Sequence, residues 1–245
     1  MNWQQQRVLV TGGTRGIGRE LVIGLRARGA KVWATGQSAT SVQQAQAALP
    51  EVVWSVCELH RPASLDAVVE VVRREGITML IHNAGVQQLR DFTSATAAES
   101  LTEHDEVQIN LVAPIVLSRA VLPALRERPG AALVFITSGL ALAPKQSSPV
   151  YCATKAGLRS FAKALRGQMK VHGWPVRVVE ALPPIVDTDM TRGRGVRKLP
   201  APAAAKQILD GLAAGRDEIY VGASRLLKAI LRLSPALGES IMIKR

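Results

Sequence analysis

The chain has 245 residues, of which 47% are hydrophobic and 20% charged, a composition typical of a globular protein with a sizeable core. Its net charge of +12 is spread from Arg7 to Arg245 without a basic tail, so we interpret most of it as solvated surface and expect no specific nucleic-acid binding. The N-terminus lacks a signal-peptide pattern, no apolar run predicts a transmembrane segment, and Cys57 and Cys152 form no disulfide framework or metal motif, so we expect a cytoplasmic protein without a metal.

Apolar, β-rich segments alternate with helical patterns along the whole chain. This alternation predicts a single Rossmann-like α/β domain, a doubly wound parallel sheet of about seven strands with helices on both faces. We place the domain at 1–222, with a substrate loop at about 187–200, and a C-terminal amphipathic helical extension at 223–245. The predicted strands are 7–12, 30–36, 52–56, 78–85, 131–138, 175–182 and 217–222, and the predicted helices are 17–29, 41–49, 62–76, 99–128, 150–172 and 201–215.

A glycine-rich loop, TGGTRGIG, stands between the first predicted strand and the first predicted helix. Glycines there permit a tight turn and let the backbone approach a pyrophosphate that sits on the helix N-terminus. The loop does not end in the Gly-Lys-Ser/Thr of a nucleotide triphosphate loop. The position therefore predicts a dinucleotide site.

The end of the second strand indicates which dinucleotide binds. An acidic residue there would hold the free 2′-hydroxyl of NAD(H) and repel a 2′-phosphate. This chain instead has Gln37 and Ser38, and it has Arg15 inside the glycine loop. These residues favour NADP(H) and leave NAD(H) as the alternative.

Tyr151 precedes Lys155 by four positions in the segment VYCATK. On a helix the two side chains lie on one face, so a phenol and an ammonium become neighbours. A phenol with an ordinary pKa near 10 needs such a neighbour to lower its pKa if it is to exchange a proton at neutral pH. The alternative is a tyrosine that merely packs on a lysine stem.

With these motifs the chain resembles the short-chain dehydrogenase/reductase family from about Arg7 to Tyr220. The family's motifs occur in its order: TGGTRGIG, HNAG, an Asn in VQINLVAP, a Ser in FITSG, YCATK and LPPIVDTDM. A looser resemblance links the chain to DltE-type bacterial oxidoreductases. The family implies an enzyme that transfers a hydride between NADP(H) and a carbonyl or alcohol, with the reductase direction favoured.

The resemblance also implies residue roles. Tyr151 is the general acid/base, Lys155 stabilises its phenolate and holds the ribose, Ser138 binds the substrate oxygen, and Asn110 helps hold a water that links Lys155 to solvent. The residues expected around the cofactor are Gly12, Thr14, Arg15, Gly16, Ile17, Gly18, Gln37, Ser38, Glu58, Leu59, Asn83, Ala84, Gly85, Tyr151, Lys155, Pro183, Ile185, Val186 and Thr188.

Three departures from the family pattern affect the substrate mouth and the oligomer. Pro184 replaces the usual Gly and removes a backbone donor beside the nicotinamide, and Glu58 replaces a more common Asp. The closing Val-Asp-Gly-Gly is absent. The family implies a homodimer or homotetramer, and the amphipathic C-terminus can pack on its own domain, contact a sister subunit or lie on a membrane surface.

The segment after Thr188 is rich in cations and often folds over the substrate in this family. Two explanations stay open for it: a substrate with an anionic handle, such as a carboxylate, coenzyme A or acyl-carrier phosphopantetheine, or a solvated loop. The alternatives to an oxidoreductase are a non-catalytic NADP(H)-binding regulatory or scaffolding protein on the same fold, an epimerase or dehydratase, and, on charge alone, a nucleic-acid binder. The loop cations are Arg192, Arg194, Arg197 and Lys198.

Overall fold

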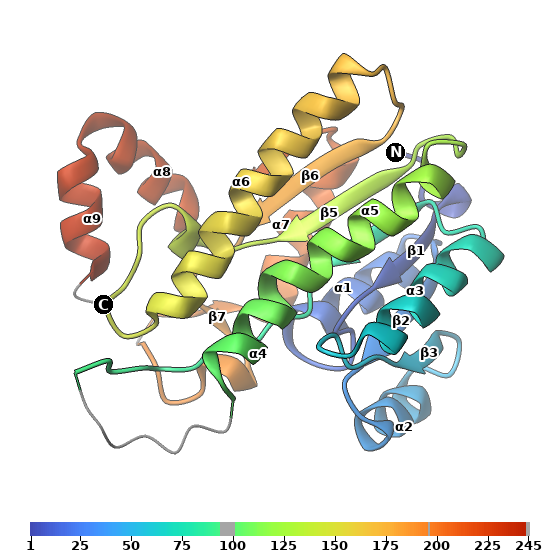
Figure 1. Ribbon diagram of the computed structural model, residues 1–245, viewed down its shortest axis with the longest axis horizontal. Coiled ribbons are helices and arrows are strands. Elements are labelled where there is room, and N and C mark those ends of the chain that lie inside the picture. Colours follow the sequence, from blue (N-terminus) through green and yellow to red (C-terminus); the bar gives the residue numbers. More distant parts are fainter. Residues whose placement is uncertain (94–100, 196, 244–245) are drawn as a thin grey trace.

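Seven parallel strands form a twisted central sheet with helices on both faces (Figure 1). The computed structural model describes residues 1–93, 101–195 and 197–243. The strand order is β3-β2-β1-β4-β5-β6-β9, with every neighbouring pair parallel. This confirms the predicted doubly wound α/β fold. The strands are β1 (Arg7–Val10), β2 (Lys31–Gly36), β3 (Val53–Val56), β4 (Met79–His82), β5 (Ala132–Ile136), β6 (Arg177–Leu182) and β9 (Glu218–Tyr220).

Helices form a layer on each face of the sheet (Figure 1). One layer contains α3 (Pro62–Arg74), α5 (Ala113–Leu125) and α6 (Pro149–Val171), and the other contains α1 (Gly16–Ala27) and α7 (Ala201–Ala213). Helix α2 (Ala39–Ala48) packs on β2 and β3 at one edge. The layers follow from the crossover connections that parallel neighbours require.

The central strands are buried on both faces, as expected of a covered parallel sheet, whereas the edge strand β3 is largely exposed. All five residues of β5 are buried. Because successive side chains point to opposite faces, Leu133 and Phe135 enter the core under α3, α5 and α6, whereas Ala132, Val134 and Ile136 enter the core under α1 and α7.

The predicted helical tract 99–128 has internal structure. Residues 94–100 lie outside the described part of the chain, and α4 (Glu103–Val107) begins after Thr102, whose side chain accepts a hydrogen bond from Asp105 N. A π-helical turn, Gln108–Val112, separates α4 from α5. Among the described residues, Glu103–Leu125 is long and apolar enough to cross a membrane by length and composition. Its contacts with α3 and α6 make it a core helix here.

Several short elements have no counterpart in the predicted list. Strands β7 (Val186–Asp187) and β8 (Leu199–Pro200) pair in parallel and close the loop between them. Three 3₁₀ turns, Trp3–Gln5, Gly139–Ala141 and Asp189–Thr191, add to them. The C-terminus forms two helices, α8 (Ser224–Leu233) and α9 (Pro235–Ile243), because Ser234 is extended and Pro235 cannot donate the next helical hydrogen bond.

Candidate active site

The glycine loop joins β1 to α1 in a conformation that needs its glycines. Gly12 and Gly16 have φ of 66° and 56°, in the left-handed region. A Cβ on Gly18 would lie 2.1 Å from Gly12 O and 2.4 Å from Asn83 Nδ2. Arg15 precedes α1 without capping it through its side chain, so the first-turn N–H groups remain available to an anion. The loop therefore fits a pyrophosphate.

Asn83, at the end of β4, holds this loop in place. Its Nδ2 donates to Thr11 O and Gly12 O, both at 3.0 Å. The backbone N–H groups of Asn83 and Ala84 in turn donate to Thr11 Oγ1. Asn83 thus fixes the floor of the predicted cofactor site.

His82, the residue before Asn83 in the HNAG motif, is a core residue. It is buried, stacks on Phe135 with ring centroids 4.8 Å apart, and lies 3.1 Å from Ser118 Oγ. Burial lowers its pKa to about 3, so the imidazole is neutral. His82 packs within the core of the sheet and does not line the cavity that contains Tyr151.

The four predicted catalytic residues come together at the carboxyl end of the sheet. Lys155 Nζ donates to Ile136 O at 3.1 Å and lies 5.7 Å from the centroid of the Tyr151 ring. Ser138 follows β5 directly, and its hydroxyl group acts to lower the pKa of Tyr151, against the larger effect of burial. Asn110 is fully buried in the π-helical turn and exchanges two 2.8 Å hydrogen bonds with the backbone of Val86.

Burial dominates the electrostatics of this pair. It raises the pKa of Tyr151 to about 12, against the opposing effect of the Ser138 hydrogen bond, and it lowers the pKa of Lys155 to about 8. The four-residue spacing predicted that Lys155 lowers the pKa of Tyr151. Burial of the phenol acts in the opposite direction and leaves Tyr151 protonated at neutral pH.

A cavity of about 820 Å³ connects the glycine loop to this pair. Ser38, Glu58 and Asn110 do not line it. Ser38 instead caps α2, and Glu58 pairs with Arg61 at 3.0 Å. The predicted residues that do line it are Gly12, Thr14, Arg15, Gly16, Ile17, Gly18, Gln37, Leu59, Asn83, Ala84, Gly85, Ser138, Tyr151, Lys155, Pro183, Ile185, Val186 and Thr188.

The four loop cations differ in their surroundings. Arg192 pairs with Asp189, and Lys198 Nζ contacts Asp187 Oδ1 at 3.3 Å and Thr191 O at 2.8 Å. Arg194 and Arg197 both line the cavity, and Arg194 donates to Gln87 Oε1 at 3.1 Å. A second cavity, of about 420 Å³, lies beside Arg15, Arg19 and Arg192 at the start of α1.

Sequence reasoning missed several residues of the cavity wall. Gln87 and Lys145 line it, and so do Ser224, Leu227 and Met242 from the C-terminal helices. The C-terminal extension therefore contributes to the site. The only sequence signal for Lys145 was its position six residues before Tyr151. The amphipathic pattern of the C-terminus indicated that it packs on another surface but not that this surface is the cavity wall.

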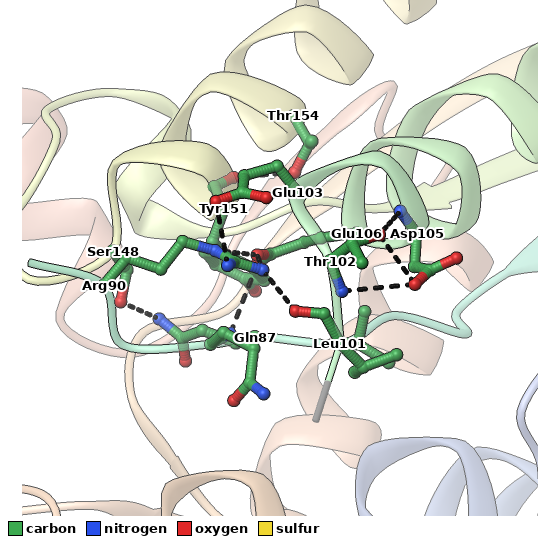
Figure 2. Close-up of polar contacts among 12 residues, drawn as sticks. Gln87, Arg90, Leu101, Thr102, Glu103, Asp105, Glu106, Ser148, Tyr151 and Thr154 are labelled. Carbon is green, nitrogen blue, oxygen red and sulfur yellow. Dashed lines mark hydrogen bonds and ion pairs between the residues drawn. The ribbon is translucent and has the colours of Figure 1, made fainter. Parts of the chain in front are cut away.

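A buried ion pair next to Tyr151 was also missed. Figure 2 shows Arg90 between the start of α4 and the Ser148 end of α6. Arg90 donates to Leu101 O at 2.8 Å, contacts Glu103 at 3.2 Å and lies 3.5 Å from Glu106 Oε2. Arg90 and Glu106 are 16 positions apart in the sequence, so no local sequence pattern indicates that they pair.

Comparisons with known proteins agree with this geometry. Residues 6–198 match the profile of the family described as short chain dehydrogenase. The uncharacterized oxidoreductase DltE of Bacillus subtilis is 36% identical, covering 89% of each chain, and the 3-oxoacyl-acyl-carrier-protein reductase FabG of Escherichia coli is 33% identical, covering 78% of each.

Solved structures show the same fold. A short chain dehydrogenase from Burkholderia cenocepacia in complex with NADP superposes with a TM-score of 0.87 at 25% identity over the whole of both chains. One from Sphingobium yanoikuyae in complex with NADPH gives 0.80 at 25% identity, covering 95% and 94%. The chain resembles DltE and is a member of the short-chain dehydrogenase family of oxidoreductases.

Proposed function

We propose that the protein reduces a carbonyl group to an alcohol with NADPH, with Tyr151 as the proton donor. The observation that carries this proposal is the convergence of Ser138, Tyr151 and Lys155 on one cavity that also contains the glycine loop. The buried, protonated state of Tyr151 supports the reductase direction, because the reduction consumes a proton at the substrate oxygen.

The residues present fit NADP(H). The glycine loop and the uncapped start of α1 would hold the pyrophosphate, and Asn83, Ala84 and Gly85 would lie beside the adenosine ribose. Arg15 and Gln37 line the cavity at the adenosine end. Gln37 stands after β2 where an acidic residue would repel a 2′-phosphate, so these residues favour NADP(H). When bound, the nicotinamide supplies the hydride. The NADP and NADPH complexes of the two structural relatives support this choice.

The chain's own residues would orient the substrate and move the proton. Ser138 and Tyr151 are two neighbouring hydroxyl groups that can both donate to one substrate oxygen, so they stabilise the negative charge that develops on it. Tyr151 then transfers its proton. Lys155, still mostly charged at pH 7, stabilises the phenolate that remains.

Asn110 would help to position the water through which a proton from solvent reaches the active site after Tyr151 has given up its own. Its amide holds the Val86 backbone on both sides, and its Nδ2 lies 3.3 Å from Thr154 Oγ1. The second lone pair of its Oδ1 is the acceptor that a water between Lys155 and solvent would use. We also propose a cytoplasmic homodimer or homotetramer, and the exposed Leu226 and Leu233 of α8 are candidate contacts.

The test is NADPH consumption at 340 nm with a panel of ketones, quinones and 3-oxoacyl thioesters, together with fluorescence titrations of NADPH and NADH. We expect tighter binding of NADPH than of NADH and an alcohol product from at least one class of substrate. Tight NADPH binding with no turnover on any class would favour the regulatory alternative. Failure to bind either nucleotide would contradict the glycine-loop argument itself.

A further inference from the structure

Two cations on the substrate side of the cavity, Lys145 and Arg194, have no acidic partner among the residues that the structure describes. Lys145 lies in the loop between Ser138 and Tyr151, and Arg194 in the loop between β7 and β8. Both side chains are partly buried and both line the cavity that contains Tyr151. We infer that they bind a carboxylate on the substrate, an inference that rests on the proposed reductase function and names its substrate class: small carbonyl acids.

Arg194 is held in position by a chain of hydrogen bonds. Its Nη1 donates to Gln87 Oε1 at 3.1 Å, and Gln87 Nε2 donates to Ser148 Oγ at 3.1 Å (Figure 2). Ser148 is fully buried at the start of α6, so it fixes which side of the amide faces Arg194. The arrangement uses one of five guanidinium donors and leaves the others for a ligand.

The charges around the cavity do not balance. Its lining includes six lysines and arginines but one acidic residue, Asp189, which pairs with Arg192. Lys198 has Asp187 as its partner. Within the described part of the chain, no carboxylate comes within ion-pair distance of Lys145 or Arg194. Burial first and the charge of Arg194 second lower the pKa of Lys145, and an anion between the two cations would oppose this fall by stabilising the charged ammonium.

The cofactor's phosphates do not account for this pair. Their expected place is the glycine loop and the start of α1, where Arg15 lies. Lys145 instead follows the Ser138 turn, and Gln87 ties Arg194 to the segment that leads into Tyr151. A carrier-bound thioester would place its phosphate at the far end of a long arm. A partly buried cation pair inside the cavity favours a charge on the substrate itself.

Apolar side chains also line this part of the cavity, beside the hydroxyl group of Ser224. Leu140, Leu227 and Met242 line the cavity on the side of Lys145 that the C-terminal helices cover, and Met242 belongs to the α9 turn whose Ile243 O accepts from Gln146 N. A ligand that matches this wall has a short hydrocarbon body with a carboxylate at one end. Such a binding site combines apolar contact with a few placed polar groups.

The experiment measures equilibrium binding, separately from turnover. Calorimetry on the NADPH-loaded protein uses linear hydroxy acids with one to four carbons between the hydroxyl carbon and the carboxylate, each beside its methyl ester. Because both ligand and cofactor are reduced, no reaction occurs. We expect at least one acid to bind about tenfold more tightly than its ester. Lys145→Met and Arg194→Gln should each remove that preference, whereas Lys170→Gln, an exposed charge change on α6, should retain it.

Three outcomes would overturn the inference: equal affinity of acids and esters, no binding of any acid in the series, or variants that weaken NADPH binding as much as acid binding. The last outcome would assign the two cations to the cofactor. A parallel assay with the matching oxo acids and neutral ketones separates this inference from the proposed function. Turnover of neutral ketones without acid preference would contradict only the carboxylate site, and absence of all turnover would contradict only the reductase assignment.

Discussion

The guanidinium of Arg90 faces the carboxylate of Glu106, with Nε and Nη2 each 3.5 Å from Oε2, although the two residues are only 5% and 0% exposed. Gln88 N donates to the other carboxylate oxygen at 3.4 Å, so the pair fastens the segment after β4 to α4. Burial raises the pKa of Tyr151 and lowers that of Lys155, and the negative charge of Glu106 adds a smaller contribution that raises both. The pair therefore holds a segment beside the active site in position and also influences the pKa values of Tyr151 and Lys155.

Glu106→Gln should destabilise the fold by about 3 kcal/mol, because the buried guanidinium of Arg90 loses its buried carboxylate and keeps the contacts with Leu101 O and Glu103. It should also shift the basic limb of the pH profile of kcat/KM to lower pH, since the pKa values of Tyr151 and Lys155 lose a contribution that raises them. Urea unfolding and pH-dependent kinetics measure the two effects. Glu103→Gln is the matched control: its carboxylate is 55% exposed and should contribute less than about 1 kcal/mol. Equal effects of the two variants would refute the special role of Glu106.

Lys155→Met should stabilise the protein at pH 7 while abolishing reductase activity. Burial lowers the pKa of Lys155 from 10.5 to about 8, so between those values the folded state binds fewer protons than the unfolded state and stability rises with pH. Below pH 8 the full penalty applies. Its removal, offset by the lost hydrogen bond to Ile136 O, should give a net gain of about 2 kcal/mol at pH 7 that falls to zero roughly one pH unit below 10.5. A variant less stable than wild type at pH 7 would show that the lysine is not penalised by burial.

Gly18→Ala should eliminate NADPH binding, because its Cβ would overlap Gly12 O and displace the glycine loop. Fluorescence titration measures the loss, and thermal unfolding should show a lower Tm. Gly167→Ala provides the control on another helix. Apart from the neighbouring backbone of its own helix, no atom of the described residues lies within 4 Å of its added Cβ, so alanine should keep nucleotide binding and raise helix stability by about 0.5–1 kcal/mol. Normal nucleotide affinity in Gly18→Ala would mean that the loop is not the phosphate site.

Gln37→Asp should reverse the nucleotide preference. A carboxylate at the end of β2 repels a 2′-phosphate and can accept hydrogen bonds from a free ribose 2′-hydroxyl. We expect NADPH affinity to fall at least about tenfold and NADH affinity to rise, as measured by parallel titrations. Gln43→Asp, on the exposed face of α2, adds the same charge away from the cavity and should leave the preference as it was. An unchanged ratio in Gln37→Asp would place the 2′-phosphate elsewhere.

The parts of the fold that sequence predicts are those whose signals are local. Strands such as β5 are apolar on both faces because each side of the sheet is covered, and the helix carrying Tyr151 and Lys155 is predicted within one residue at each end. The motif residues then meet without further information, since the carboxyl ends of parallel strands share one edge of the sheet.

The parts that sequence does not predict depend on contacts between distant segments. Lys145 and Arg194 line one cavity only because two distant loops face it, and the pairing of Arg90 with Glu106 is a tertiary contact. Pro235 causes the break between α8 and α9, and the expectation of a single amphipathic extension did not take this proline into account. The direction of the Tyr151 pKa depends on how deeply the phenol is buried, which spacing alone cannot supply.

The most direct test of the central claim compares wild type with Tyr151→Phe, which removes only the phenolic oxygen. NADPH oxidation at 340 nm with a reducible ketone and NADPH affinity by fluorescence should be measured on the same samples. Loss of the proton donor should lower kcat by about 10²–10⁴-fold with NADPH affinity within about twofold of wild type. A variant that turns over ketone at the wild-type rate would contradict the assignment of Tyr151 as the proton donor.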